Sequence, residues 1–372
     1  MCGIAGIFNY RSALTPPFSW LKAMSDAMAH RGPDGDAFYA AGACGLTHRR
    51  LSIIDLEGGR QPLSNEDGTV WVSFNGEIYN YKPLMNDLAG RGHQLRTRCD
   101  TETIVHAYEE RGAACVDALQ GMFAFAIWDE KKRRLLLARD RVGIKPLYYV
   151  DDGERIVFAS EIGALLAVPG VRREACPDAA RQFLAFGFVP APLTGLRGVK
   201  KLPPGHTLAC EVGGSPRVER YWRRPIGAFD RRWSGRGAKW EAARELRSLL
   251  DRTVASHLQS DVPLGMLLSG GIDSTTILGS TARQVPGPVK TFSVYFGESS
   301  YYDETPMARL ASRAFGTEHH ELLVTPERFV EELPHMIRHM EEPVIEAAAV
   351  PLLALARLVR EHVTVVLSGE GA

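Results

Sequence analysis

The sequence predicts a two-domain protein, with a first part rich in β-strands and a second part that is an α/β domain with a parallel sheet. Three observations carry this prediction. The chain has 372 residues, more than the ~250 to 300 at which one hydrophobic core usually stops growing. Short apolar runs dominate the first half. The second half alternates apolar strands with helices, which is typical of a parallel sheet covered on both faces.

The expected domains are residues 1–212 and 238–372, joined by a Gly-, Arg- and Trp-rich linker over 213–237. In the first domain, period-two and helical patterns predict strands at 3–8, 44–51, 70–74, 123–128, 134–139, 147–150 and 155–159, and helices at 20–29, 82–88 and 101–111. In the second domain the same patterns predict helices at 239–258, 304–315 and 353–361, and a further helix that begins at residue 274. They predict strands at 262–268, 290–294, 320–324 and 363–367.

The composition bears on which partners and which cellular location can be expected for the protein. Forty-four basic residues balance forty-four acidic ones, which gives no electrostatic reason to expect nucleic acid or a membrane as a partner. There is no apolar run long enough to cross a bilayer and no secretory signal, so we expect a cytoplasmic protein; a homodimer is left open. The six cysteines include no Cys-x-x-Cys pair, and their spacing indicates neither zinc nor a disulfide framework.

Cys2 is the most informative residue of the first half. Removal of Met1 would leave an N-terminal cysteine that carries both a thiol and an α-amine. An α-amine has a pKa of about 7.7 to 8.0, so near neutral pH it can accept the thiol proton and later return it to a leaving amine. The alternative is a small, inert cysteine buried at the start of a strand.

Three polar segments would complement this nucleophile. Arg50, at the edge of an apolar strand, is suited to a bidentate contact with an α-carboxylate. Asn75 and Gly76 offer the two kinds of N–H donor that an oxyanion hole needs, while Asp100 can hold an ammonium group or simply cap a helix. A surface arginine and an Asn-Gly β-turn are the competing interpretations. Jointly, the segments predict attack on the side-chain amide of a bound amino acid.

The turn Ser269-Gly270-Gly271-Ile272-Asp273-Ser274 lies between an apolar strand and a helix. Adjacent glycines and a helix start let backbone N–H groups approach a polyanion. Asp273 would repel phosphates unless a divalent cation lay between them, so we interpret it as a Mg²⁺ ligand. A plain glycine-rich turn with a solvated aspartate is the alternative. Because the turn differs from the Gly-x-x-x-x-Gly-Lys-Ser/Thr pattern, we expect adenylation with pyrophosphate release.

The order of these motifs resembles a known family. Seven segments resemble the class II, N-terminal-nucleophile glutamine amidotransferases. They are residues 2–4, 30–34, 50–55, 61–63, 74–80, 100–102 and 121–126. With 139–149, the 269–274 turn and 368–371, the whole chain resembles the glutamine-hydrolysing asparagine synthetases of the bacterial B type. The resemblance implies an αββα sandwich followed by an α/β domain of the adenylating pyrophosphatase type.

The resemblance also implies roles for individual residues. Cys2 would be the nucleophile, with Asn75 and Gly76 as the oxyanion hole. The implied glutamine-pocket residues are Arg50, Leu51, Ser52, Ile53, Ile54, Glu77 and Asp100. The implied ATP residues are Leu268, Ser269, Gly270, Gly271, Asp273, Ser274, Val294, Ser368 and Gly369, with Asp273 on Mg²⁺ and Glu370 near the acceptor.

The implied reaction releases ammonia from glutamine through a γ-glutamyl thioester. Ammonia crosses an internal passage and displaces AMP from a β-aspartyl-adenylate, which ATP and aspartate form. The sequence ends at Ala372, where the family continues with an acidic pair, so we expect a truncated synthetase domain, exposed apolar surface and retained glutaminase chemistry. A ligase with another carboxylate acceptor and a non-catalytic regulatory protein are the alternatives. We assign His319-His320 no ligand role.

Overall fold

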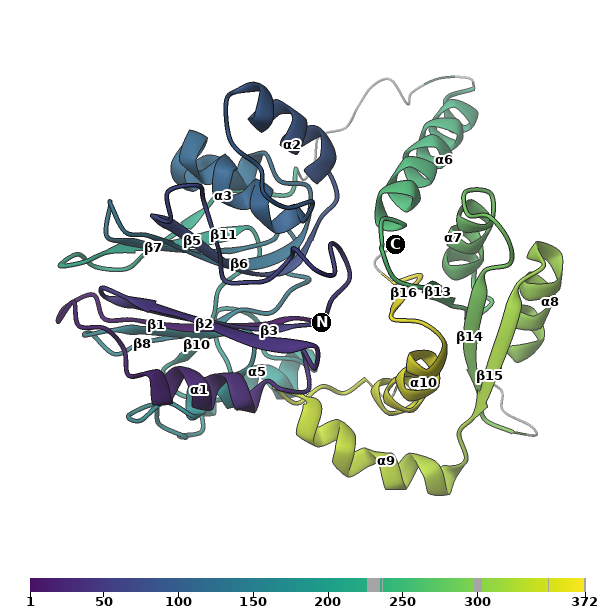
Figure 1. The fold of residues 1–372 in the computed structure, drawn as a ribbon. Helices are drawn as coiled ribbons and strands as arrows, with labels where there is room; N and C mark the ends of the chain where they lie inside the picture. Colours follow the sequence, from purple (N-terminus) through teal and green to yellow (C-terminus); the bar gives the residue numbers. More distant parts are fainter. Residues whose placement is uncertain (226–234, 236, 298–302, 347, 371–372) are drawn as a thin grey trace. The chain divides into compact units, whose positions relative to one another are not determined.

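The computed structural model describes residues 1–225, 235, 237–297, 303–346 and 348–370, and these form two compact units (Figure 1). The first unit comprises Met1–Arg224 and Glu341–Ile345, and the second contains the other described residues from Pro225 onwards. None of the described helices combines the length and hydrophobicity that a membrane-spanning segment requires.

The first unit contains two six-stranded sheets in which every pairing is antiparallel. The first sheet has the order β10 (Val199–Lys201), β8 (Tyr148–Asp151), β9 (Ile156–Ala159), β1 (Gly3–Phe8), β3 (Cys44–Arg50) and β2 (Gly35–Ala41). The second has the order β12 (Arg217–Arg220), β11 (His206–Glu211), β7 (Arg134–Arg139), β6 (Gly121–Asp129), β5 (Val70–Ile78) and β4 (Leu63–Ser64).

The two sheets face each other, and helices cover their outer faces, as Figure 1 shows. Helices α1 (Phe18–Ala27) and α4 (Ile162–Leu166) pack on the first sheet, and α2 (Tyr81–Gly90) and α3 (Asp100–Arg111) on the second. Strand β1 shows why this arrangement forms. Its side chains alternate, so that Ile4 and Phe8 join the core between the sheets while Ala5 and Ile7 pack against α1. The predicted αββα sandwich is confirmed.

The second unit is built on a four-stranded parallel sheet of order β15 (Glu318–Leu323), β14 (Lys290–Tyr295), β13 (Leu264–Leu267) and β16 (Val365–Leu367). Helices α7 (Ile272–Ala282) and α8 (Thr305–Phe315) pack on one face, and α10 (Ala349–His362) packs on the other. Neighbouring residues of β13 therefore serve different cores: Met266 lies with α7 and α8, and Leu267 lies with α10. The parallel α/β sheet that the alternation predicted is confirmed.

Several elements were missed by the sequence patterns. These are the strands β2, β4, β10, β11 and β12, the helices α4, α5 (Pro177–Phe186) and α9 (Pro326–His339), and the 3₁₀ turn Gly112–Asp117. Helix α9 contains Pro334, and an internal proline normally argues against a helix. Strand β12 lies inside the predicted linker over 213–237 and pairs with β11. Residues 226–234 and 236 of that linker, and Gly371 and Ala372, lie outside the described residues.

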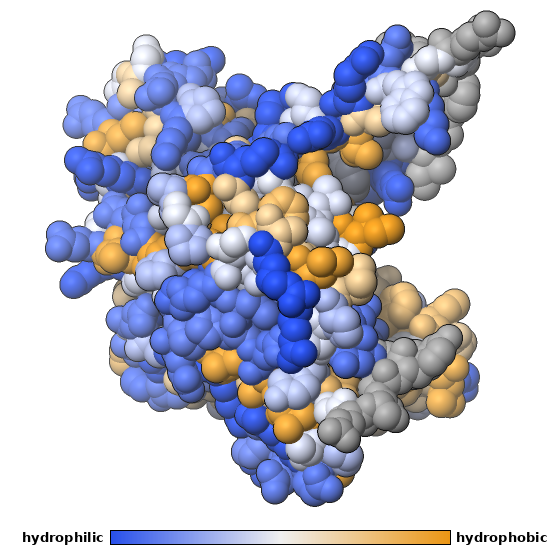
Figure 2. Space-filling model, turned by 90° about the vertical axis from the view of Figure 1, so that its right-hand side faces the viewer, coloured by the Kyte–Doolittle hydropathy of each residue, from blue (hydrophilic) through white to orange (hydrophobic). Residues whose placement is uncertain are grey.

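Apolar side chains are exposed on the helices of the second unit. Trp240 and Leu246 of α6 (Ala238–His257) and Val330 of α9 are each at least 66% exposed. Apolar residues, in orange, lie among hydrophilic ones on the face drawn in Figure 2. The expectation that a shortened sheet exposes apolar surface stays a prediction.

Candidate active sites

The first candidate site is a small cavity of ≈ 60 Å³ around Cys2. Cys2 immediately precedes β1. The other walls come from the ends of β3 and β5, the beginning of α3, the loop after β3 and the loop between β7 and β8. The lining residues are Met1, Cys2, Arg50, Leu51, Ile53, Ile54, Gly59, Gln61, Phe74, Asn75, Gly76, Glu77, Cys99, Asp100, Thr101 and Lys145. The structure thus brings together every residue that the sequence assigned to nucleophile, oxyanion hole and glutamine pocket, apart from Ser52.

The Cys2 sulfur is held against the backbone of Leu51. The Leu51 N–H donates to Cys2 Sγ at 3.4 Å, and Sγ lies 3.6 Å from the Leu51 carbonyl oxygen. Arg31 fixes the backbone by donating from Nε to the Cys2 carbonyl at 2.9 Å, while its Nη1 pairs with Glu161 at 2.9 Å. Burial raises the pKa of the Cys2 thiol, and the Leu51 N–H partly offsets this. A group that accepts the thiol proton is therefore needed for nucleophilic attack.

Asn75 presents an unused donor to this cavity. Its side chain is 1 % exposed, and its Nδ2 has no hydrogen-bond partner among the described residues. A buried amide donor without a partner costs about 1–3 kcal/mol, so such groups are expected where a ligand completes the bond. The next residue must be glycine, because a Cβ at Gly76 would lie 2.1 Å from the Met122 carbonyl oxygen on the paired strand.

Gln61 joins the strand that carries Asn75 to helix α3. Its Oε1 accepts the Phe74 N–H at 2.7 Å, and its Nε2 donates to Thr101 Oγ1 at 3.1 Å. The side chain is buried, so both bonds are shielded from water. Gln61 therefore sets the position of the Asn75 donor relative to the residues that α3 contributes.

Two buried carboxylates face the same cavity. Burial, together with the charge of Asp100, raises the pKa of Glu77 to about 7. Burial also raises the pKa of Asp100 to about 6, although the Ile78 N–H donates to Asp100 Oδ2 at 2.9 Å. Asp100 is the first residue of α3. The pair forms a site of negative potential that suits a substrate ammonium group.

Arg50 also lines the cavity, although its guanidinium is partly engaged. It donates to the backbone carbonyl oxygens of Leu56 at 2.8 Å and Asp55 at 2.6 Å. These bonds orient the guanidinium group of Arg50, and its remaining N–H donors are suited to an α-carboxylate. Ser52 does not line the cavity. Its N–H donates to Asp34 Oδ2 at 2.8 Å, so its contribution is to the loop around the site.

The second candidate site is a cavity of ≈ 340 Å³ in the second unit. It lies at the carboxyl ends of the parallel strands, where open α/β sheets bind ligands. The lining residues are Leu267, Leu268, Ser269, Gly271, Asp273, Ser274, Phe292, Ser293, Val294, Phe296, Asp303, Glu304, Thr305, Ala308, Leu355, Ser368, Gly369 and Glu370. Of the residues assigned to ATP, Mg²⁺ and acceptor, only Gly270 is not among them.

The glycine-rich turn of this cavity depends on two close contacts. Gly270 has φ +82°, and a Cβ there would lie 2.4 Å from the Ala308 nitrogen. A Cβ at Gly369 would lie 2.7 Å from the Ser274 nitrogen. Ser269 Oγ accepts the Gly271 N–H at 3.2 Å and lies 3.0 Å from Ser274 Oγ. The turn therefore presents hydroxyls and the start of α7 to the cavity, as a polyphosphate site requires.

Oxygen ligands suited to a hard divalent cation lie beside this turn. Asp273, Asp303 and Glu370 all line the cavity. Hydrogen bonds from Thr305 lower the pKa of Asp303, which keeps that carboxylate ionised. Carboxylates next to a phosphate cradle fit Mg²⁺, so the donor set agrees with the prediction for Asp273.

Comparison with known proteins identifies the family to which the chain belongs. Residues 1–222 match a family described as "Glutamine amidotransferase domain", and residues 245–372 match the family "Asparagine synthase". All of the chain aligns, at 32% identity, with 74% of a putative glutamine-hydrolysing asparagine synthetase 2 from Methanocaldococcus jannaschii. The chain belongs to the glutamine-hydrolysing asparagine synthetase family.

The relatives to which this chain aligns are longer than the chain. Asparagine synthetase 1 of Bacillus subtilis is 38% identical over the whole chain, which covers 58% of that protein, and asparagine synthetase 3 is 33% identical with 62% covered. The chain thus spans about three-fifths of the length of these relatives. Among solved structures, "Structure of the allosteric regulatory enzyme of purine biosynthesis" matches 86% of the chain and 80% of its own, with TM-score 0.45 and 17% identity.

Lys145 also lines the Cys2 cavity, although the sequence patterns assigned it no individual role. It is 6 % exposed, and burial lowers its pKa while the charge of Glu77 opposes that change. Its Nζ lies 3.3 Å from Met1 Sδ. Asp140 shapes the loop that carries it, because this carboxylate accepts the N–H groups of Gly143 at 2.7 Å and Lys145 at 2.9 Å. The sequence signals were its place in the segment 139–149, which contributes to the resemblance, and its position within the apolar stretch 142–150.

Proposed function

We propose that the protein makes asparagine from aspartate and ATP, with ammonia that it releases from glutamine at Cys2. The observation that carries the proposal is the unpartnered Nδ2 of Asn75 in the cavity that also contains the Cys2 thiol. A nucleophile and a buried, unused donor in one cavity are what amide attack requires. The match to the glutamine amidotransferase family supports the same reaction.

The glutaminase half needs removal of Met1, because the nitrogen of Cys2 is otherwise an amide and accepts no proton. After removal, the free α-amine takes the thiol proton and the thiolate attacks the glutamine amide carbon. Asn75 Nδ2 and the Gly76 N–H stabilise the oxyanion. The C–N bond then breaks as the α-ammonium returns the proton to the departing ammonia, which leaves a γ-glutamyl thioester. Water hydrolyses the thioester to glutamate.

Charge complementarity orients glutamine in this reaction. Glu77 and Asp100 lie in the cavity to receive its α-ammonium, and Arg50 is placed for the α-carboxylate. Leu51, Ile53 and Ile54 supply the apolar wall along the substrate's methylene groups. Burial raises the pKa of both carboxylates, and an ammonium group between them would return them to the ionised form.

The second cavity would bind ATP and aspartate. Its Ser269–Ser274 turn is suited to the phosphates, and Leu268 and Val294 supply an apolar wall for the base. Mg²⁺ bound near Asp273 would neutralise phosphate charge. The β-carboxylate of aspartate displaces pyrophosphate from ATP to form the β-aspartyl-adenylate, and ammonia then displaces AMP to give asparagine. Ser368 and Gly369 contact the nucleotide in this proposal, and Glu370 lies near the acceptor. We also propose that the protein is located in the cytoplasm.

The nucleophile is tested by labelling with an electrophilic diazoketone analogue of glutamine, followed by intact-mass measurement. We expect one adduct per chain, on a protein that has lost Met1, and none in Cys2→Ala. Cys176→Ala is the matched control, because Cys2 and Cys176 are the two cysteines that are not fully buried. An adduct that persists in Cys2→Ala, or full glutaminase activity in a chain that keeps Met1, refutes the proposed chemistry.

The acceptor is tested separately by measuring AMP, pyrophosphate and amide product with aspartate and with other small carboxylic acids. We expect aspartate to give asparagine with glutamine or ammonium as nitrogen donor. Product from another acid alone would replace aspartate in the proposal and leave the glutaminase half unaffected. Glutamate release without any ATP-dependent product would restrict the activity of this chain to glutamine hydrolysis.

A further inference from the structure

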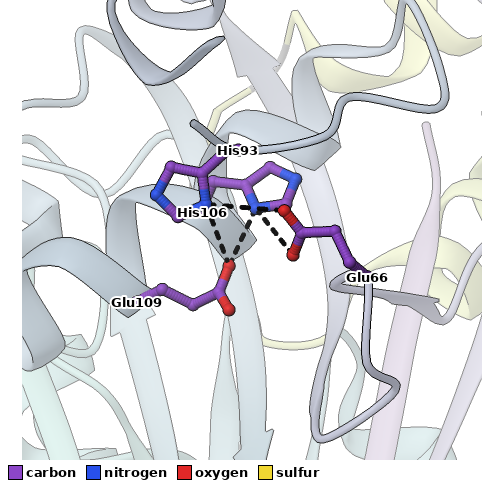
Figure 3. Close-up of side chains that lie close together, drawn as sticks. All are labelled: Glu66, His93, His106 and Glu109. Atoms are coloured by element: carbon purple, nitrogen blue, oxygen red, sulfur yellow. Dashed lines mark hydrogen bonds and ion pairs between the residues drawn. The ribbon is translucent and has the colours of Figure 1, made fainter. Parts of the chain in front are cut away.

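A cluster of two histidines and two glutamates lies in the first unit, outside the Cys2 cavity (Figure 3). Glu66 is in the turn between β4 and β5, His93 is in the segment between α2 and α3, and His106 and Glu109 are on α3. One nitrogen or oxygen atom from each residue lies within 4.8 Å of those of the others. Figure 3 shows the two carboxylates directed at the same pair of imidazole rings. Residues far apart in the sequence thus converge on one point.

The separations between these atoms fit a tetrahedral metal ion. His106 Nδ1 lies 2.8 Å from Glu109 Oε2 and 3.7 Å from Glu66 Oε2. His93 Nδ1 lies 3.5 Å from Glu109 Oε2 and 3.7 Å from Glu66 Oε1. Zinc bonds of about 2.0–2.1 Å in a tetrahedron place neighbouring ligand atoms roughly 3.3 Å apart. These four histidine–glutamate distances bracket that value, and the ligand atoms of all four residues lie within 4.8 Å of one another.

The other ring nitrogen of each histidine faces a further carboxylate. His93 Nε2 lies 3.2 Å from Glu110 Oε1, and His106 Nε2 lies 3.6 Å from Glu102 Oε1. Carboxylates in this position orient metal-binding imidazoles and make them better ligands. The glutamate of the cluster on α3 is also oriented, because Asn65 Nδ2 donates to Glu109 Oε1 at 2.7 Å and leaves Oε2 towards the imidazoles.

The charge around the cluster favours a dication. Four carboxylates surround two imidazoles. The nearby cations are Arg91, 3.4 Å from Glu110, Arg96, whose guanidinium donates to the Glu66 carbonyl oxygen, and Lys131, whose charge interacts with Glu109. A metal ion bound between the two imidazoles would supply positive charge among these carboxylates.

We propose that Glu66, His93, His106 and Glu109 bind one divalent transition-metal ion, with Zn²⁺ as the best fit. Two imidazoles exclude a preference for Mg²⁺ or Ca²⁺, which bind oxygen ligands. All four positions are filled by protein, as in structural zinc sites. The ion joins α3 to the β4–β5 turn and to the segment before α3. It therefore supports the helix whose first residue, Asp100, lines the Cys2 cavity.

A second histidine cluster in the other unit provides an internal comparison. Glu318, His320 and His362 also offer three close ligand atoms, with His320 Nε2 3.0 Å from Glu318 Oε1. Glu318 is exposed, and the His320 and His362 rings are tilted against each other with centroids 4.0 Å apart. Glu109 of the first cluster is exposed as well, but the second cluster has fewer ligands and no buried member, so we expect it to bind a metal weakly.

The test is metal binding by the full chain after removal of bound metal with a chelator. The Cys2→Ala background excludes binding by the N-terminal thiol. We expect one tight Zn²⁺ site in competition with a chromophoric chelator, and Co²⁺ in its place should give the intense visible absorption of a four-coordinate ion. His93→Gln should weaken Zn²⁺ binding at least about 100-fold, and Glu110→Gln about 10- to 100-fold. His320→Gln, the matched control, should leave tight binding unchanged.

Each outcome bears on the proposal. His93 is outside the helices and strands, so His93→Gln is expected to keep the fold, which circular dichroism checks; the buried His106 serves as a second position. Absence of a four-coordinate Co²⁺ spectrum, or a tight site that survives His93→Gln and is lost in His320→Gln, would overturn the proposal. The cluster would then be a protonated hydrogen-bond network. These readouts do not depend on glutaminase or synthetase activity.

Discussion

Replacement of Asn75 by alanine should reduce glutaminase activity while leaving stability almost unchanged. Loss of one oxyanion-hole donor costs about 10²- to 10³-fold in kcat, or about 2.7–4 kcal/mol. In the unliganded protein, however, Asn75 Nδ2 is buried without a partner. Removing it relieves a penalty of about 1–3 kcal/mol, which offsets the packing that the truncation loses. We therefore expect Asn75→Ala to lose glutaminase activity and to keep almost all of its unfolding free energy.

Asn80→Ala is the matched control, because the amide of Asn80 is fully used. Its Nδ2 donates to the Ala118 carbonyl at 2.9 Å, and its Oδ1 accepts the Gln120 N–H at 2.8 Å. This variant should lose about 1–3 kcal/mol of unfolding free energy and keep its kcat. The assays are glutamate release under saturating glutamine and urea unfolding. An Asn75→Ala protein with unchanged kcat, or one that is destabilised as much as Asn80→Ala, would refute the assignment of an unsatisfied oxyanion donor.

Two further predictions follow from the same physical reasoning. Because burial raises the pKa of Glu77 from its ordinary value of 4.5 to about 7, the wild type loses stability relative to Glu77→Gln as pH rises from about 4.5 through 7. The difference is at most about 3 kcal/mol, and urea unfolding at pH 5 and pH 8 measures it; a constant difference contradicts the prediction. Gly270→Ala should weaken ATP binding at least about tenfold in calorimetric titration, because its Cβ would meet Ala308. Gly287→Ala, with φ +81° but open space, controls for backbone strain, and equal losses in both variants would contradict the steric argument.

Local sequence patterns predicted most elements of both units because the apolar side chains follow the period of each element. Strand β1 has the predicted bounds, and α3 begins one residue earlier than expected. The motifs also identified about half of the residues that line each cavity, including the nucleophile and the glycine-rich turn. Patterns failed where a contact is long-range: Lys145 reaches the Cys2 cavity through a loop that Asp140 organises, and no local spacing encodes that approach.

The histidine and glutamate cluster shows the same limit more sharply. Its four residues are separated by 27, 13 and 3 positions in sequence order, counted from Glu66, His93, His106 and Glu109. Only the last interval has the spacing of neighbours on one helix face. The other two intervals depend on how α2, α3 and the β4–β5 turn pack together. A search for metal motifs among the cysteines could not find this site, because no cysteine belongs to it.

Helix α3 shows why polar partners matter as much as apolar packing in this unit. Residues 100–108 are all buried, although the first four are Asp, Thr, Glu and Thr. Each has a partner: Asp100 accepts from Ile78, Thr101 from Gln61, Glu102 from the Arg96 and Thr97 N–H groups, and Thr103 donates to the Asp100 carbonyl. Since an unpaired buried polar group costs about 1–3 kcal/mol, the helix is stable only while these contacts persist. A metal ion bound to His106 and Glu109 would provide a partner for two polar side chains further along the same helix. Zinc at 100 times its Kd should therefore raise the unfolding free energy of this unit by about 2.7 kcal/mol.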